Sequence, residues 1–316
     1  MNPEPSTTSR GELFANFERL DERTPRARFR GVTAGNGPPV LLLHGYPQTH
    51  AAWHVVAPRL AAHHTLVIPD LPGYGESELL DAGPWHKRAV AEELLALMHQ
   101  LGHQRFGVVG HDRGARSGYR LALDHPESVF AFASLAVVPI HDVWPALDRA
   151  YAMSVFHWFL LAQPGDLTER LLSSDPDFFL DTTLDRMAGG IDSLHPLAVA
   201  SYREAFRKTT VRRAIIEDYR ASHGADAAHD ASDVAAGRKI ACAVLVLWAA
   251  ERLVASGMEA PSGLSAAQVW QRWAADVRGI EVSCGHLIPE QAPDETLDAL
   301  IPFLNRGAMT PCMGGA

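Results

Sequence analysis

The strongest chemical signal in the sequence is an aspartate inside a turn, Gly110-His111-Asp112-Arg113-Gly114, between a buried strand and a helix. The glycines let helix and strand pass closely, and the strained turn projects the central side chain from the edge of a sheet. The following helix directs N–H groups and the positive end of its dipole at the carboxylate, which favours the ionised form. We therefore predict that Asp112 is an ionised nucleophile. The alternative interpretation is an ordinary helix cap.

A carboxylate nucleophile limits the chemistry that the protein can perform. Its attack on an ester or an amide gives an anhydride, which is a poor intermediate. Its attack on an sp³ carbon displaces a halide or opens an epoxide, and leaves an alkyl ester that water can cleave. Dehalogenation and epoxide hydrolysis are therefore the two predicted reactions.

Three more motifs fit the same arrangement. Residues 44–47 (HGYP) follow a strand at the place where a backbone donor for an oxyanion is expected, and residues 70–77 (DLPGYGES) follow the next strand. Residues 283–286 (SCGH) lead from a strand into a loop that carries His286. A nucleophile followed much later by a histidine is the chain order of α/β hydrolases.

Short apolar runs, separated by helical patterns, predict the scaffold that positions these residues. Alternating strands and helices indicate a parallel sheet covered on both faces. From residue 141 to about residue 237 the alternation stops, and the chain becomes helical segments broken by proline and glycine. Strands are predicted at 40–43, 65–68, 106–109, 129–138 and 243–247, with a helix at 87–101.

These patterns predict the fold class α/β, as an α/β-hydrolase fold with a mostly parallel sheet, helices on both faces and an inserted α-helical cap. The core is discontinuous in sequence, because its first part covers residues 13–140 and its second part covers residues 238–306. The cap covers residues 141–237, between the two parts. The two ends of the chain lack periodicity and are expected to fray.

The charge balance excludes a polyanionic partner. The 316 residues include 28 Lys and Arg against 37 Asp and Glu, which gives a formal net charge of -9. A surface that binds nucleic acid needs a basic footprint, so we expect no nucleic-acid partner. An acidic protein also repels small anions at long range, so an anionic substrate requires a local group of cations.

The sequence shows no sign of secretion, of a membrane span or of a metal motif. The first residues are polar and acidic, and the longest apolar passage, 129–140, is too short to cross a bilayer. The three cysteines lack CxxC spacing and the histidines lack HExxH spacing. We expect a cytoplasmic protein with no cofactor, no metal site and no membrane partner.

The chain resembles the haloacetate (fluoroacetate) dehalogenases from about Pro38 to Phe303. The resemblance rests on the segments HGYPQTHAAWHVVAPRL, DLPGYGES, GHDRGARSGYRLALDHP, RAYAMSVFHWFLLAQP, DPDFFL, EDYRA and GHLIPEQAPDET. The nucleophile turn and the opening motif are shared with epoxide hydrolases, whereas residues 151–164 are more specific to the haloacetate group. The resemblance implies conversion of a short 2-haloacid to the 2-hydroxyacid through a covalent aspartyl ester.

The resemblance implies a role for five residues of the core. Asp112 would displace halide from the α-carbon, and Arg113 and Arg116 would hold the carboxylate of a small anionic substrate. Two arginines three residues apart share one side of a helix, and a guanidinium matches a carboxylate with paired hydrogen bonds. His286 would activate the water that hydrolyses the ester. The backbone N–H groups of Tyr46 and Arg113 would receive the oxyanion.

In the cap, the resemblance implies a halide pocket made of His157, Trp158 and Tyr219. Their N–H and O–H donors would stabilise the leaving anion in a dry site. Without the resemblance, a His-Trp pair in a helical segment is typical of packing. Related enzymes are commonly dimers, so a homodimer is the expectation by analogy.

The position of the acid that orients the histidine departs from the family pattern, and Ser154 in the cap is a second departure. The acid that orients the histidine is expected at residue 136, where this chain has Ala136. Glu251, which follows the next-to-last strand of the sheet, is the first candidate to replace it, and Asp142 is the second. Losing such an acid in protease triads costs about four orders of magnitude in turnover. If nothing replaces it, the ester should form and accumulate.

Two alternatives to a dehalogenase remain open. An epoxide hydrolase needs cap tyrosines that donate to the epoxide oxygen, and Tyr151, Tyr202 and Tyr219 keep that function open. Arg113 and Arg116 count against a neutral epoxide. A catalytically weak, ligand-binding homologue is the third interpretation, because the usual triad acid is missing.

Overall fold

The computed structural model describes residues 13–249 and 264–309. Glu251, the first candidate for the missing acid, lies outside these residues, so its role stays a prediction. Within the described part of the chain, no helix has the length and apolar character needed to cross a membrane.

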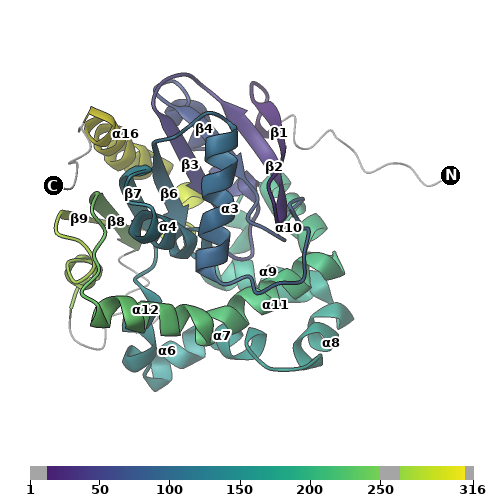
Figure 1. Cartoon of the computed structure of the whole chain (residues 1–316). Helices are drawn as coiled ribbons and strands as arrows, with labels where there is room; N and C mark the ends of the chain where they lie inside the picture. Colours follow the sequence, from purple (N-terminus) through teal and green to yellow (C-terminus); the bar gives the residue numbers. More distant parts are fainter. Residues whose placement is uncertain (1–12, 250–263, 310–316) are drawn as a thin grey trace.

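A single sheet of nine strands runs through the described residues (Figure 1). The strands are β1 (Glu18–Arg23), β2 (Ala27–Ala34), β3 (Pro39–Leu43), β4 (Thr65–Pro69), β5 (Glu78–Leu79), β6 (Phe106–His111), β7 (Val129–Leu135), β8 (Ala243–Ala249) and β9 (Val277–Val282). Their order is β1-β2-β4-β3-β6-β7-β8-β9, with β5 beside β2. All neighbours from β4 to β9 are parallel, whereas β2 pairs antiparallel with β1, β4 and β5. The predicted α/β class with a mostly parallel sheet is confirmed.

Helices of the core cover both faces of this sheet. They are α2 (Ala57–Leu60), α3 (Lys87–Gln100), α4 (Arg113–Asp124), α14 (Ala266–Trp270), α15 (Ile288–Gln291) and α16 (Pro293–Met309), with the 3-10 helix η1 (His50–Trp53). The helices α3 and α4 pack against each other over one face, and α16 packs against β6 and β7.

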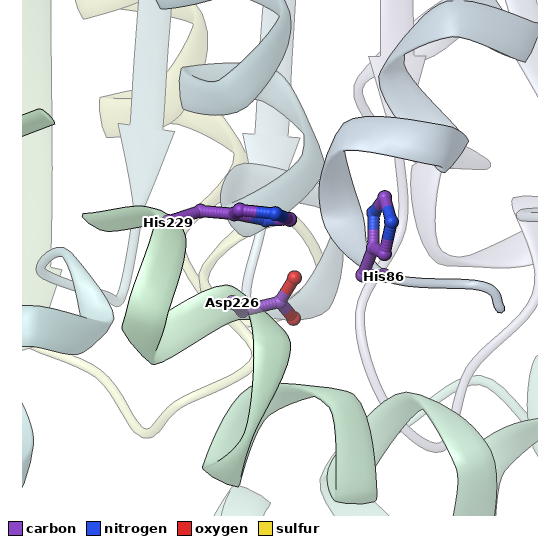
Figure 2. Close-up of side chains that lie close together, drawn as sticks. All are labelled: His86, Asp226 and His229. Atoms are coloured by element: carbon purple, nitrogen blue, oxygen red, sulfur yellow. The ribbon is translucent and has the colours of Figure 1, made fainter. Parts of the chain in front are cut away.

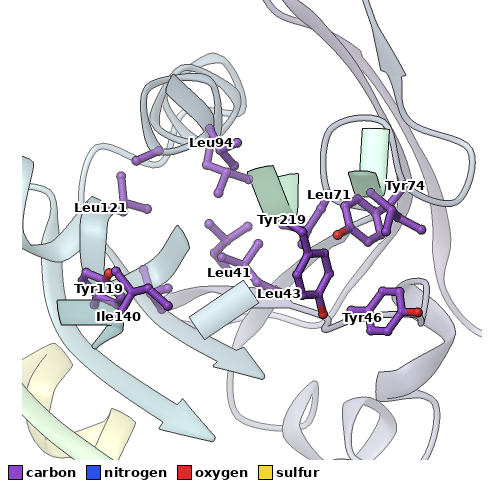
Figure 3. Packing of buried hydrophobic residues seen from close by; sticks show 14 of the residues in the cluster. Leu41, Leu43, Tyr46, Leu71, Tyr74, Leu94, Tyr119, Leu121, Ile140 and Tyr219 are labelled. Atoms are coloured by element: carbon purple, nitrogen blue, oxygen red, sulfur yellow. The ribbon is translucent and has the colours of Figure 1, made fainter. Parts of the chain in front are cut away.

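The central strands are buried on both faces. In β3, Leu41 and Leu43 belong to one hydrophobic cluster, whereas Val40 and Leu42 belong to the other. Successive side chains of a strand alternate between faces, so a strand covered on both sides is apolar throughout. Figure 3 shows the first cluster, in which Leu94 of α3 lies above Leu41 and Leu43. The sheet therefore gives a rigid base to the residues at its edge.

The described chain between β7 and β8 contains helices and no strand, and these helices gather below the sheet in Figure 1, in teal and green. They are α5 (Ile140–Val143), η2 (Trp144–Ala146), α6 (Arg149–Ser154), α7 (Phe156–Leu161), α8 (Leu167–Ser174), α9 (Pro176–Ala188), η3 (Ile191–Ser193), α10 (Pro196–Phe206), α11 (Thr209–His223) and α12 (Ala225–Ala235). We keep the name cap for residues 141–237. Its division from the core as a separate unit stays a prediction.

One strand is shorter than the sequence predicted. The expected strand at 129–138 ends at Leu135, the last residue of β7. The reason is Ala136, whose φ of 67° lies in the left-handed region, where extended backbone cannot continue. Ala136 therefore turns the chain out of the sheet just before the cap begins.

The turn at Asp112 depends on close packing at two glycines. Asp112 has φ 47° and ψ -113° between β6 and α4. A Cβ on Gly114 would lie 2.3 Å from the carbonyl oxygen of Leu43. A Cβ on Gly110 would lie 2.4 Å from the Cα of Ala115. Because both neighbours are backbone atoms, only glycine lets the helix and the strands approach this closely.

Gly114→Ala should therefore lower the free energy of unfolding by about 3 kcal/mol, because the backbone of β3 must move to accept the methyl group. Urea unfolding followed by fluorescence measures this loss. Gly102→Ala is the matched control, since its φ is 86° but no atom lies within 4 Å of the added Cβ. It should cost only the roughly 1 kcal/mol of backbone strain. Equal losses in the two variants would contradict the packing argument.

Candidate active site

The carboxylate of Asp112 is buried where β3, β6 and α4 meet. Its Oδ1 accepts a hydrogen bond of 2.9 Å from the backbone N–H of Tyr46. Gly45 makes this approach feasible, because a Cβ there would lie 2.6 Å from the Cβ of Asp112. The N–H of Tyr46 thus stands where the sequence predicted an oxyanion donor. Arg113, the second predicted donor, begins α4 directly after the nucleophile.

The other carboxylate oxygen faces the predicted histidine. Oδ2 of Asp112 lies 3.6 Å from Nε2 of His286. Burial alone would raise the pKa of Asp112, but its interaction with His286 and the charges of His111 and Arg113 hold that pKa well below the usual value. Asp112 therefore stays ionised. The backbone holds Oδ1, and Oδ2 is the oxygen placed to react.

A small cavity of about 20 Å³ lies between the nucleophile and the cap. Five predicted site residues line it: Asp112, Arg116, His157, Trp158 and His286. This volume holds about one water molecule, so the site is closely packed. Core and cap each contribute walls, and the structure brings the predicted nucleophile, base, cation and two halide donors together.

The third predicted halide donor, Tyr219, lies beside the other aromatic groups of the site. Its ring centroid is 5.2 Å from that of Tyr46 and 5.9 Å from that of His157, and Figure 3 shows Tyr219 next to Tyr46. The ring of His157 in turn stacks on Tyr46 at 5.4 Å. The Tyr219 hydroxyl is buried and has no hydrogen-bond partner among the described residues. A buried donor of this kind is suited to an anion.

The two predicted carboxylate-binding arginines have different surroundings. Nε of Arg113 donates to Asp218 of α11 at 2.8 Å, and Nη2 donates to Asp218 at 2.5 Å and to Ser222 at 2.7 Å. The guanidinium also lies 4.5 Å above the ring of Tyr219. Arg113 is therefore turned toward the cap helix and away from the cavity that Arg116 lines. Only Nη1 of Arg113 donates to none of the described residues.

Arg116 is a buried cation that forms no ion pair with a carboxylate among the described residues. Only 2% of the residue is exposed, and its Nη1 donates to the carbonyl of Val138 at 3.3 Å. The guanidinium lies 5.2 Å from the ring centre of Trp158. Its Nε is buried without a partner, and no carboxylate in residues 13–249 or 264–309 forms an ion pair with it. Such a group is costly to bury unless an anion joins it.

The comparison with protein families decides the assignment, because the model of the alpha/beta hydrolase fold family matches residues 38–231. The chain belongs to the α/β-hydrolase family. This hydrolase is 36% identical to the fluoroacetate dehalogenase of Burkholderia sp. over 93% of its own length and 95% of the relative. The predicted membership of the haloacetate dehalogenase-like group is therefore confirmed.

Other relatives of the hydrolase carry a different name. A soluble epoxide hydrolase from Corynebacterium sp. is 28% identical, with 87% of this chain and 93% of the relative covered. A Pseudomonas aeruginosa protein described provisionally as an epoxide hydrolase has been solved as a threonine-to-aspartate variant with bound MFA. That structure is 51% identical, with a TM-score of 0.88, and covers 92% of this chain and 97% of its own. The names of the relatives thus agree on hydrolysis but differ in the substrate, which is a haloacetate in one relative and an epoxide in the others.

The hydrolase has alanine at the usual acid position, and the structure places that residue in the cavity wall. Ala136 lines the cavity together with His286. Asp142, the second candidate for the acid, is engaged elsewhere, since it pairs with Arg272 and accepts a 2.6 Å hydrogen bond from the indole of Trp273. Asp142 therefore binds the β8–β9 side of the core, and its predicted role as the acid gains no support.

Sequence reasoning missed a buried relay that supports the His286 loop. The carbonyl of His286 accepts a 2.8 Å hydrogen bond from Nε2 of His111, and Nδ1 of His111 lies 3.1 Å from the side-chain amide of Gln48. Burial, together with the charge of His286, lowers the pKa of His111 to about 3. In the structure Oε1 of Gln48 faces His111 and Nε2 faces Glu290. A neutral imidazole that donates from Nε2 must accept at Nδ1, so we assign the Gln48 amide the opposite orientation, with its NH₂ toward His111.

The far end of the relay is a carboxylic acid. With its NH₂ toward His111, Gln48 turns its oxygen toward Glu290, with which its amide is hydrogen-bonded. Burial raises the pKa of Glu290 to about 8, so its carboxyl group carries a proton at neutral pH and can donate to Gln48. The resemblance covered GHLIPEQAPDET but gave no role to Glu290. Only the fold shows that its carboxyl group meets Gln48.

Glu290→Gln tests this relay through the pH dependence of stability. The folded pKa of about 8 exceeds the ordinary value of 4.5, so the contribution of Glu290 is full below pH 4.5 and is lost as the pH rises through 8. The variant should match the wild type near pH 5 and exceed its unfolding free energy near pH 9. Urea unfolding at both pH values measures the difference. Glu295→Gln, at an exposed position, is the control and should show no such trend. If the unfolding free energies of Glu290→Gln and the wild type differ by the same amount at both pH values, Glu290 carries no proton in the folded state.

Proposed function

We propose that this hydrolase removes halide from a short 2-haloacid, such as fluoroacetate or chloroacetate, and releases the 2-hydroxyacid. The observation that supports this most is Arg116, a buried guanidinium in the cavity wall with no described carboxylate paired to it. A substrate carboxylate supplies the missing charge, and paired N–H donors match its two oxygens. The fluoroacetate dehalogenase among the relatives supports the same substrate class.

In the first half-reaction, Oδ2 of Asp112 attacks the α-carbon from the side opposite the halogen. The new C–O bond forms as the carbon–halogen bond breaks, and the halide leaves with the electron pair toward His157, Trp158 and Tyr219. These donors stabilise the anion in a site closed to bulk water. Arg116 holds the carboxylate, which fixes the direction of attack.

In the second half-reaction, His286 accepts a proton from a water molecule that attacks Cγ of the Asp112 ester. The charge that develops on Oδ1 is received by the backbone N–H of Tyr46, which already donates to that oxygen at 2.9 Å. The bond between Cγ and Oδ2 then breaks, and the product alkoxide takes a proton from His286. The hydroxyacid leaves, and the Asp112 carboxyl group, which keeps the second proton of the water, releases it to solvent and becomes a carboxylate again.

The size of the site favours a short substrate. A cavity that holds about one water molecule accepts a two-carbon acid after small side-chain movements, but an aryl epoxide needs the cap to open further. The buried Tyr219 hydroxyl favours the second candidate, an epoxide hydrolase, because it could donate to an epoxide oxygen. Tyr151 lines the cavity as well, whereas Tyr202 does not. Arg116 has no role with a neutral epoxide, so we place this function second.

Arg116→Leu should lower kcat/KM for chloroacetate by about 100-fold, because it removes charge-assisted hydrogen bonds made in a dry site. Halide release measures the rate, and styrene oxide opening provides the neutral comparison. Arg213→Leu, at an exposed position of α11, should leave both rates unchanged. Unchanged chloroacetate kinetics in Arg116→Leu would exclude the carboxylate contact. Opening of styrene oxide by a wild-type enzyme that ignores chloroacetate would support the epoxide hydrolase.

Ala136→Asp tests the missing acid. If no other acid replaces the one missing at Ala136, the wild type should accumulate an ester on Asp112, seen by intact-protein mass spectrometry as one added carboxymethyl group after mixing with chloroacetate. Ala136→Asp should clear the ester and raise turnover by up to about four orders of magnitude. Asp112→Ala is the control and should form no adduct. An unmodified wild-type mass during steady halide release would point to a replacement acid such as Glu251, and absence of both adduct and release would support the ligand-binding homologue.

A further inference from the structure

A second group of reactive side chains lies outside the catalytic cavity (Figure 2). His86 precedes α3 in the core, whereas Asp226 and His229 lie three residues apart on α12 in the cap. Residues with this spacing share one side of a helix. One ligand atom from each of the three residues lies within 4.8 Å of the other two. The fold thus brings two imidazoles and a carboxylate together from segments far apart in sequence.

The group contains buried polar atoms that the described fold leaves unused. Asp226 is 4% exposed, and its Oδ1 accepts a 2.7 Å hydrogen bond from the backbone N–H of Lys87. Its Oδ2 is buried and has no partner among the described residues, and the same holds for Nδ1 of His229. The ring centroids of His86 and His229 are 4.8 Å apart. Burying such atoms unpaired is costly, and a bound cation would satisfy both.

The donor types indicate which cation fits. Two imidazole nitrogens and one carboxylate oxygen are ligands that Zn²⁺ prefers, with water completing a tetrahedron. Mg²⁺ and Ca²⁺ prefer oxygen ligands, so they match this group less well. Ligand atoms of a tetrahedral zinc ion are roughly 3.3 Å apart. The two imidazoles are half-buried, and rotation of their side chains closes the difference from 4.8 Å.

Ligation by His86 has a cost at the start of α3. Nδ1 of His86 accepts a 3.1 Å hydrogen bond from the backbone N–H of Ala89 and caps the helix. A neutral imidazole that binds metal through Nε2 carries its proton on Nδ1, and one that binds through Nδ1 has no lone pair left for the backbone. Either mode gives up the cap. Asparagine caps helices well, so His86→Asn removes the imidazole and keeps a capping side chain.

The group is accessible from solvent. His86, Lys87 and Ala225 line an open cleft of about 900 Å³ between the core and the cap. His86 and His229 are each partly exposed, whereas Asp226 is buried beneath them. A metal ion can therefore reach the site without unfolding of either helix.

We propose that His86, Asp226 and His229 bind one divalent transition-metal ion, with Zn²⁺ as the best match, and that the ion clamps the cap to the core. The ion joins α12 to the residue that begins α3. Because the ligands are brought together only by folding, binding stabilises the folded state. The site is independent of the proposed dehalogenase activity and takes no part in the reaction.

The test titrates Zn²⁺ into the full-length, tag-free, chelator-treated protein and follows binding by calorimetry. The wild type should bind one ion per chain, and its Tm should rise with Zn²⁺. His86→Asn and His229→Ala should each weaken binding by about tenfold or more and remove the rise in Tm. With Co²⁺ as a second probe, the visible absorption of a nitrogen- and oxygen-ligated ion should appear in the wild type and disappear in both variants.

His63→Asn is the control, because His63 is an exposed histidine outside the group, and its binding and Tm shift should equal those of the wild type. Circular dichroism of the metal-free variants separates loss of a ligand from loss of the fold. Equal Zn²⁺ binding by all four proteins would overturn the proposal. No binding at millimolar Zn²⁺ would overturn it too. A Tm that changes with pH but not with added Zn²⁺ or Co²⁺ would also overturn it.

Discussion

The contact on which the site depends is the buried pairing of Asp218 with Arg113. Asp218 also accepts a 2.8 Å hydrogen bond from the hydroxyl of Tyr74 and pairs with Lys87 at 2.7 Å. Removing one partner of a buried pair leaves an uncompensated charge, which is far more costly than the pair is stabilising. Because Asp218 belongs to the cap and Arg113 directly follows the nucleophile, this pairing fixes the cap over the turn. Tyr219, the next residue of α11, is thereby held against the Arg113 guanidinium.

The same pairing determines the charge of the site. Two carboxylates lie among three cations: Asp218 pairs with Arg113 and Lys87, and Asp112 lines the cavity together with Arg116. Burial lowers the pKa of Lys87 to about 8, which still leaves it mostly charged at neutral pH. The site therefore has one positive charge in excess, inside a protein whose formal net charge is -9. Local field and bulk field have opposite signs, so the buried cations can attract an anion that the surface as a whole repels.

The sequence was most informative where local sterics determine the structure. The turn at Asp112 follows from glycine spacing and a strand-to-helix transition, both of which are readable within a few residues. It was least informative where partners come from distant segments. No residue close to Arg113 in sequence indicates that Asp218 occupies most of its donors. Likewise, no residue close to Glu290 in sequence indicates that its partner is Gln48. His86 and its partners on α12 meet only because the cap folds back over the start of α3, so spacing rules for metal motifs could not find them.

At Ala136 the backbone conformation suits a short polar residue, although the side chain is a methyl group. Its φ of 67° suits glycine, asparagine or aspartate, and costs alanine about 1 kcal/mol or more. The backbone thus keeps a conformation that favours a short polar side chain beside His286, while the chain provides only a methyl group. Displacement of a leaving group needs an ionised Asp112 and a bound substrate, and neither depends on that side chain. Ester hydrolysis needs His286 in one tautomer and one orientation, which an acid normally fixes. In the proposed reaction, Ala136 therefore leaves the first step unaffected, whereas the rate of the second step depends on another group that orients His286.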